Sequence, residues 1–118
     1  MIINDWNSKY VTGKVQVRVR TYPADKSPAI ELLDARTGEP ETCLTVCMKD
    51  YGSKPIPGHA FIKLYSENEG SLEELLRHNL VEDTLERIDA GYVRNGVACV
   101  KLGPELLALF LQQGYGAV

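Results

Sequence analysis

The chain has 118 residues, of which 44% are hydrophobic and 25% charged, and this composition is typical of an ordinary soluble globular protein. The length predicts one domain over residues 1–118, and no apolar stretch approaches the roughly 20 residues that a membrane span requires. An odd number of cysteines, three, and a start without a basic-then-apolar leader predict a cytoplasmic protein without a disulfide framework, and the net charge of −3 does not by itself indicate nucleic acid.

The first half of the chain predicts strands. Residues 1–8 carry no clear pattern, and we expect their one tryptophan, Trp6, to cover an end of the core. In residues 14–22, valines alternate with basic or polar residues, which predicts a strand with one buried and one wet face. Residues 29–34 predict a second strand, and Thr37 and Gly38 predict the hairpin turn that leads to its partner.

That partner is expected over residues 41–48, and a fourth strand over residues 59–65. Residues 84–88 and 91–93 predict two further short strands. The Asn95-Gly96 pair predicts the next hairpin turn, because these residues tolerate positive φ angles, and residues 97–102 predict the returning strand.

Residues 71–80 carry the clearest helical pattern. Ser71 and Glu74 have the spacing of a capping box, in which each side chain accepts a hydrogen bond from a free N–H of the first turn. The short amide of Asn79 tolerates the left-handed conformation that ends a helix. An apolar stripe is formed by Leu72, Leu75, Leu76 and Leu80. The positions expected to face water are Glu73, Glu74, Arg77 and His78.

A second helix is predicted over residues 105–113, with Pro104 opening it. Leucine and phenylalanine cover most of its circumference, so it is either sunk in the core or one side is an interface. The residues predicted for self-association, as a homodimer, are Leu107, Phe110 and Leu111. Together the elements predict an α+β fold: a mainly antiparallel sheet of five to six strands, with one helix on it and a C-terminal helix.

Acidic residues are concentrated between positions 66 and 90, where eight carboxylates accompany two arginines. We expect an acidic face that binds a protein partner through complementary charge. The predicted acidic face consists of Glu67, Glu69, Glu73, Glu74, Glu82, Asp83 and Glu86.

Basic residues gather earlier, on the wet face of residues 14–22. Lys14, Arg18 and Arg20 are the alternative site, which would bind the phosphates of a nucleic acid. Lysine and arginine on an outer strand also protect sheets from edge-to-edge aggregation, and no aromatic residues are interleaved here for stacking on bases. The sequence therefore favours a protein partner over nucleic acid.

No constellation of residues predicts catalysis, a metal or a cofactor. Cys43 and Cys47 lie four residues apart and Cys99 is distant, whereas a structural zinc site needs four ligands in closely spaced pairs. Either His59 or His78 would have to complete such a site. Buried thiols that act as small hydrophobic groups are the favoured interpretation, and a small enzyme built on Cys43, Cys47 or His59 is the weakest of the alternatives.

The chain resembles a family of small proteins of unknown function that are encoded by conjugative elements, prophages and other mobile DNA. The motifs are residues 28–32 (PAIEL), 38–40 (GEP), 44–46 (LTV), 61–62 (FI), 79–82 (NLVE) and 90–93 (AGYV), together with the glutamate-rich lead into the first helix. Small acidic proteins of mobile DNA include anti-restriction and anti-CRISPR inhibitors. This resemblance implies a phage or mobile-element protein that blocks a nuclease or effector surface.

The sequence thus predicts a non-catalytic cytoplasmic protein of a mobile element that acts by protein–protein contact, as a counter-defence inhibitor. The alternative is a nucleic-acid-binding accessory protein that uses the basic strand face.

Overall fold

The computed structural model describes residues 1–116, with side chains at all of these positions except 50 and 113–116. One sheet contains β1 (Ile2–Asn7), β2 (Thr12–Thr21), β3 (Pro28–Asp34) and β4 (Pro40–Cys43), and the other contains β5 (His59–Lys63), β6 (Val81–Ala90) and β7 (Val93–Leu102). The helices are α1 (Ser71–Arg77) and α2 (Pro104–Gly116), and short 3-10 turns occupy Met48–Tyr51 and Ser66–Asn68.

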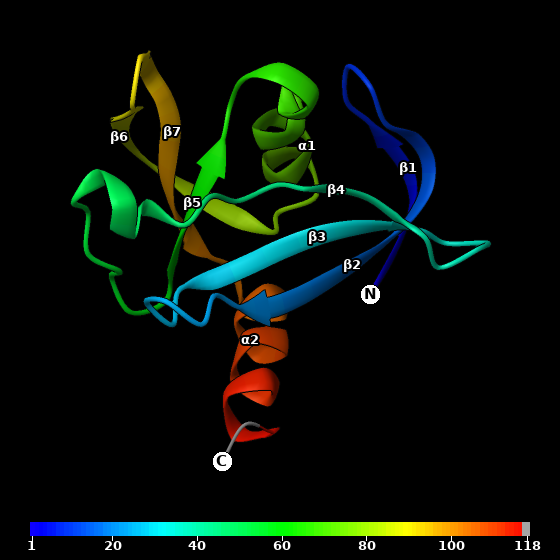
Figure 1. Cartoon of the computed structure of the whole chain (residues 1–118). Coiled ribbons are helices and arrows are strands. Elements are labelled where there is room, and N and C mark those ends of the chain that lie inside the picture. Colours follow the sequence, from blue (N-terminus) through cyan, green and yellow to red (C-terminus); the bar gives the residue numbers. More distant parts are fainter. Residues whose placement is uncertain (117–118) are drawn as a thin grey trace.

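The fold is α+β with antiparallel strand pairing, as predicted, but the strands form two sheets (Figure 1). The orders are β1-β2-β3-β4 and β5-β7-β6, so the expected single sheet of five to six strands is wrong. Residues 44–46 join the two sheets. The Leu44 N–H donates to the Ile30 carbonyl in β3, whereas the Leu44 carbonyl accepts from Lys63 in β5.

The same junction explains why the strand expected over residues 41–48 is short. β4 ends at Cys43, and the chain then leaves β3 to run beside β5, where Thr45 pairs with Ile62. The Thr45 hydroxyl accepts a hydrogen bond from the Ile30 N–H at 3.1 Å and so replaces a backbone partner. A pattern of alternating residues does not reveal that a strand changes its neighbour.

β1 occupies the segment in which no pattern was found. Its buried residues, Ile3 and Trp6, are three apart, because the register with β2 shifts between them. A strand with such a bulge loses the period of two by which strands are recognised. Trp6 is almost completely buried, which confirms that it belongs to the core.

The last two strands form a hairpin whose turn lies earlier than predicted. Gly91 adopts a φ of 60°, Ala90 pairs with Val93, and Asn95 and Gly96 lie inside β7. Gly96 is needed there for space, because a Cβ atom would lie 2.6 Å from Val93 Cγ1. The two short strands expected over residues 84–88 and 91–93 are therefore wrong: β6 is one strand with an internal bulge, and Val93 begins β7.

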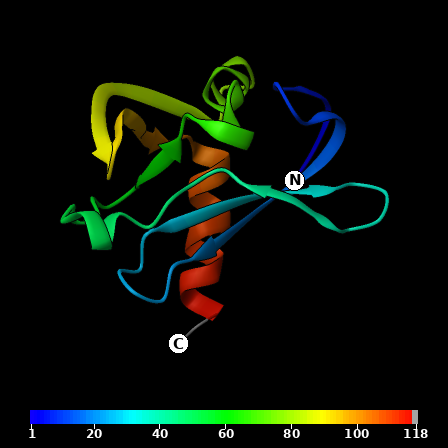
Figure 2. The ribbon, with the colours of Figure 1, turned by 45° about the horizontal axis from the view of Figure 1, so that its top comes forward.

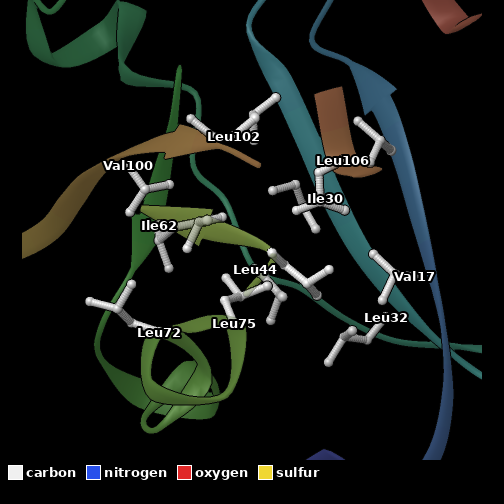
Figure 3. Packing of buried hydrophobic residues seen from close by; sticks show 14 of the residues in the cluster. Val17, Ile30, Leu32, Leu44, Ile62, Leu72, Leu75, Val100, Leu102 and Leu106 are labelled. Atoms are coloured by element: carbon white, nitrogen blue, oxygen red, sulfur yellow. The ribbon is translucent and has the colours of Figure 1, made fainter. Parts of the chain in front are cut away.

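The main core lies between the two sheets and under both helices. Alternate residues of β2, β3, β5 and β7 point into this space, and the leucines of α1 and Leu106 of α2 close it (Figure 3). The labelled side chains are Val17, Ile30, Leu32, Leu44, Ile62, Leu72, Leu75, Val100, Leu102 and Leu106.

α1 lies between β6 and β1 (Figure 2). Its start differs from the predicted capping box, because Gly70 is the N-cap residue and the buried Ser71 hydroxyl makes no hydrogen bond. Leu72, Leu75 and Leu80 are buried as expected, but Leu76 is 37% exposed. The left-handed conformation of Asn79 is confirmed by its φ of 57°.

α2 begins at Pro104, as predicted, packs on β2 and extends away from the sheets (Figure 1). Within residues 1–116, no helix has both the length and the apolar character that crossing a bilayer would require.

Candidate functional site

Glu74 of α1 is buried, which contradicts the expectation that it faces water. Its side chain is 8% exposed and accepts a hydrogen bond from the Asn7 N–H of β1 at 2.7 Å. Arg77 binds both Glu74 oxygens at 2.8 and 2.9 Å and continues to the Asp5 carboxylate at 3.1 Å. His78, expected in water, is half-buried beside the same two acids. This network fastens α1 to β1.

The electrostatics of this network favour the charged forms. The hydrogen bonds from Arg77 lower the pKa of Glu74, against the effect of burial. The pKa of Arg77 is raised, first by Glu74 and then by Asp5. A carboxylate that is buried and paired in this way holds the fold together, so Glu74 is not available to a partner.

The β6 bulge is the second arrangement built on an acid and an arginine. Residues 84–86 lie opposite the single residue Cys99 of β7, because Asp83 pairs with Val100 and Arg87 pairs with Ala98. Arg87 binds both oxygens of Asp83, at 2.9 and 2.8 Å. The Asp83 carboxylate also accepts from the Leu85 N–H, and Thr84 donates to the Cys99 carbonyl at 2.7 Å. The bulge is therefore fastened at both ends.

Leu85 stands at the top of this bulge. Its φ is 70°, a left-handed angle that is costly for leucine, and 80% of the residue is exposed to solvent. Arg87 lowers the pKa of Asp83, and the pKa of Arg87 is raised chiefly by Asp83, with a smaller effect of Glu73 on α1.

The seven residues of the predicted acidic face divide into two groups. Glu67 pairs with Lys63 and Glu69 with Lys9, both at 2.8 Å, and Glu74 and Asp83 bind their arginines. The hydrogen bond from Lys63 lowers the pKa of Glu67 to about 2. Among the described side chains, the remaining three form no ion pair and are exposed. We call Glu73, Glu82 and Glu86 the acidic surface.

The predicted basic face is present on the outer side of β2, but it is partly neutralised. Arg18 and Arg20 both bind Glu31 of β3, at 3.0 and 3.6 Å. Lys14 is exposed, and it forms no ion pair with any side chain in the described part of the chain. Two positive charges thus share one carboxylate, and the face carries less charge than its sequence indicates.

The residues predicted for self-association are partly used by the fold. Leu107 and Phe110 are half-buried against the main core, next to the fully buried Leu106. Leu111 is 47% exposed. Of the three, Leu111 is the residue most free to contact another molecule.

The cysteines do not form a cluster. Cys99 is buried and its pKa is raised by burial, but Cys47 is half-buried and Cys43 is exposed, so the expectation of buried thiols holds for Cys99 alone. The Cys43 sulfur lies 3.4 Å from the Tyr22 hydroxyl, whose pKa is raised by burial. His59 Nδ1 lies 2.9 Å from the Pro57 carbonyl. Across the described residues, no group of three His, Cys, Asp or Glu side chains has a metal-binding arrangement.

Sequence reasoning did not find Leu85 or its supporting pair. Asp83 and Arg87 have the spacing of a helical ion pair. In a regular strand, two residues at this spacing share a face but lie about 13 Å apart, so only a bulge brings their side chains into contact. This spacing was the one signal in the sequence that could have revealed the bulge.

Comparison of the chain with family models, with curated proteins and with solved structures finds no match.

Proposed function

We propose that this chain is a non-catalytic protein that acts by protein–protein contact through its acidic surface. The observation that carries the proposal is the difference between the two charged regions. Glu73, Glu82 and Glu86 are exposed and have no ion-pair partner among the described side chains, whereas Glu31 compensates two arginines of the basic face. A surface with uncompensated carboxylates attracts a basic partner and speeds its association.

The basic partner that we propose is the nucleic-acid-binding surface of a host nuclease or effector. Three carboxylates on α1 and β6 would compete with phosphates for the same lysines and arginines. The sequence resemblance to proteins of mobile DNA supports this context, in which the chain is a cytoplasmic counter-defence inhibitor of the anti-CRISPR or anti-restriction kind. Such an inhibitor needs no catalytic residues and no cofactor.

The test is DNA cleavage by a panel of purified restriction endonucleases and CRISPR effector nucleases, with and without the purified chain. We expect the chain to suppress at least one of them, and added salt to relieve the suppression, because charged surface contacts are screened. The triple variant Glu73→Lys, Glu82→Lys and Glu86→Lys is expected to lose inhibition at least tenfold, which is about 1.4 kcal/mol of binding free energy.

The matched control is the triple variant Glu39→Lys, Glu41→Lys and Glu105→Lys, which makes the same change in net charge at three other exposed glutamates. This control should inhibit almost as well as the parent chain. Equal inhibition by the two triple variants would contradict the assignment to α1 and β6, and uninhibited cleavage by the whole panel would contradict the counter-defence role.

A nucleic-acid-binding accessory role is the second candidate, favoured by the exposed and unpaired ammonium group of Lys14 among the described side chains. If Lys14, Arg18 and Arg20 bind phosphates, the affinity for DNA or RNA falls steeply with salt concentration. Charge reversal at these three positions would then abolish binding, and reversal on the acidic surface would not. Filter binding at several salt concentrations separates the two candidates.

A further inference from the structure

The exposed edge of β6 has two apolar features next to the acidic surface. β6 is an end strand of its sheet, so no further strand covers this edge. Leu85 projects from the bulge with 80% of its surface in solvent, and the first residues of β6 line a groove. The exposed side chain of Leu85 and the groove at the start of β6 are two separate features of this edge.

The groove lies where β6 begins, β7 ends and α2 starts, and its volume is about 450 Å³. Its apolar lining comes from Val81, Leu102, Pro104 and Leu107, and its charged lining from Glu82 and Lys101. Glu82 and Lys101 face each other across the strand pair without forming an ion pair. The groove is large enough for one bulky apolar side chain of a partner.

The order of these features along the strand defines a footprint. Val81 pairs with Leu102, and the bulge that carries Leu85 lies opposite Cys99, three residues along β7. At about 3.3 Å per residue, the groove and the bulge are therefore separated by roughly 10 Å. Glu82 lies between them in the chain, and Glu86 follows Leu85. An extended segment of about four residues along this edge would span the groove and Leu85 and pass close to both carboxylates.

We propose that this edge of β6 binds an extended basic segment of the partner protein, with one apolar side chain in the groove and a second apolar contact at Leu85. This proposal rests on the proposed function and specifies the chemistry of its partner. The charges of Glu82 and Glu86 select lysine or arginine in that segment, and Lys101 disfavours a cation directly above it. The bulge interrupts the regular ladder over residues 84–86, so recognition relies on side chains rather than on an added strand.

The conformation of Leu85 supports a contact at this position. A left-handed φ is unfavourable for leucine, and exposure of its apolar surface to water is unfavourable as well. The Asp83 and Arg87 pair nevertheless holds the bulge in this shape. A partner that covers Leu85 removes the cost of exposing its apolar surface to water. Because the bulge is already held in shape, it requires no further ordering on binding.

The test uses the full chain, labelled for NMR, and three synthetic peptides. The first is Lys-Lys-Trp-Lys-Lys, the second has glycine in place of tryptophan, and the third has glutamate in place of lysine. We expect the first peptide to shift the amide signals of residues 81–87 and 102–107. Burial of its tryptophan should make it bind about tenfold more tightly than the glycine peptide, and the glutamate peptide should not bind.

Two variants show whether the apolar features carry the difference. Leu85→Gly relieves the left-handed strain and is expected to stay folded, and Leu107→Asn makes the groove polar, with circular dichroism as a check of folding. Each should reduce the preference for tryptophan over glycine at least threefold. Tyr92→Ser, at an exposed residue outside this footprint, is the matched control and should keep the preference.

The outcomes separate this inference from the proposed function. Equal binding of the tryptophan and glycine peptides at the acidic surface would overturn the apolar contact and leave the charge-based contact standing. Absence of binding by both lysine peptides would overturn both. If light scattering shows a dimer that Leu85→Gly dissociates, the occupant is a second copy of the chain and the basic segment is wrong.

Discussion

Two carboxylate–arginine pairs, one on α1 and one on β6, have different roles. On the β1 side, Arg77 binds Glu74, which is 8% exposed and also accepts the Asn7 N–H. On the β6 side, Arg87 binds Asp83 within one strand and stabilises a bulge at the edge of the sheet. The two members of the first pair also bind Asn7 and Asp5 and so join α1 to a strand that is far away in sequence, whereas the second pair shapes a local piece of surface.

This difference shows that the chemistry of an ion pair does not decide its function. What decides it is whether the groups bound by the carboxylate belong to separate elements, because each carboxylate also accepts a backbone N–H. Loss of Glu74 leaves the part-buried Asn7 N–H of β1 without its acceptor, whereas loss of Asp83 frees only the exposed N–H of Leu85, two residues along the same strand. We therefore expect the β1 side to control stability and the β6 side to control binding.

The largest expected effect is that of Glu74→Ala. A hydrogen bond to a charged group contributes about 1.5–3 kcal/mol, so the free energy of unfolding should fall by about 2–3 kcal/mol in urea denaturation. Glu73→Ala, at the exposed neighbour, is the control and should change it by less than about 0.5 kcal/mol. Equal effects of Glu74→Ala and Glu73→Ala on the free energy of unfolding would contradict the role of the β1 side in stability.

The same pair predicts a pH dependence. The folded-state pKa of Glu74 lies below its ordinary value of 4.5, so its contribution is present above that pH and is lost as the pH falls through the lower, folded-state pKa. We expect acidification below pH 4.5 to destabilise the parent chain more than Glu74→Gln. Urea midpoints measured at neutral pH and at several acidic pH values test this, and parallel curves for the two proteins would contradict it.

A smaller effect is expected at the bulge. Asp83→Ala removes two hydrogen bonds from Arg87 and one from the Leu85 N–H, but all three lie within one strand and the Leu85 N–H is exposed, so no other element is released. We expect a loss of about 1 kcal/mol in stability, with larger changes in the amide signals of residues 84–86. Glu82→Ala is the control. If Asp83→Ala lowered the free energy of unfolding as much as Glu74→Ala does, the distinction between the β1 side and the β6 side would be wrong.

Leu85→Gly should have the opposite sign. Relief of a left-handed leucine is worth roughly 1–2 kcal/mol, and glycine loses about 0.5–1 kcal/mol in backbone entropy, so stability should rise by about 0.5 kcal/mol. Leu76→Gly, at the exposed leucine of α1, should instead lower stability by about 1 kcal/mol. A loss of stability on Leu85→Gly would mean that this side chain contributes to the fold.

The smallest effect on stability is expected for Leu111→Glu, which should change it by less than about 0.5 kcal/mol because the residue is exposed. If α2 mediates a homodimer, this variant halves the mass measured by light scattering. An unchanged mass would exclude Leu111 from self-association.

The elements that the sequence predicted correctly are those determined by neighbouring residues. The valines of β2 alternate, Gly38 adopts the positive φ of its turn, Asn79 ends its helix and Pro104 begins α2. These features depend on backbone preferences and on burial of one face, which act over a few residues. They are therefore visible in a single sequence.

The failures have a common cause, which is that distant groups determine the local structure. Glu74 is buried because it accepts from the Asn7 N–H of β1, 67 residues away, and because its partner Arg77 binds Asp5, 72 residues from Arg77. Glu69 likewise binds Lys9, which is 60 residues away. The other three acids that leave the predicted acidic face, Glu67, Glu74 and Asp83, pair with cations only three or four residues away, and the β6 bulge is what brings Asp83 and Arg87 together. Three of the seven predicted residues therefore remain as the acidic surface.

Trp6 gives this arrangement a spectroscopic consequence. It is the single tryptophan of the chain, it is 1% exposed, and its ring N–H donates to Ser8 Oγ at 2.9 Å. It also lies beside Asn7, through which β1 is bound to Glu74. Its fluorescence therefore reports the docking of β1 on α1, while circular dichroism reports both sheets. Separation of the two signals during unfolding would identify the β1 side as the first part of the molecule to open.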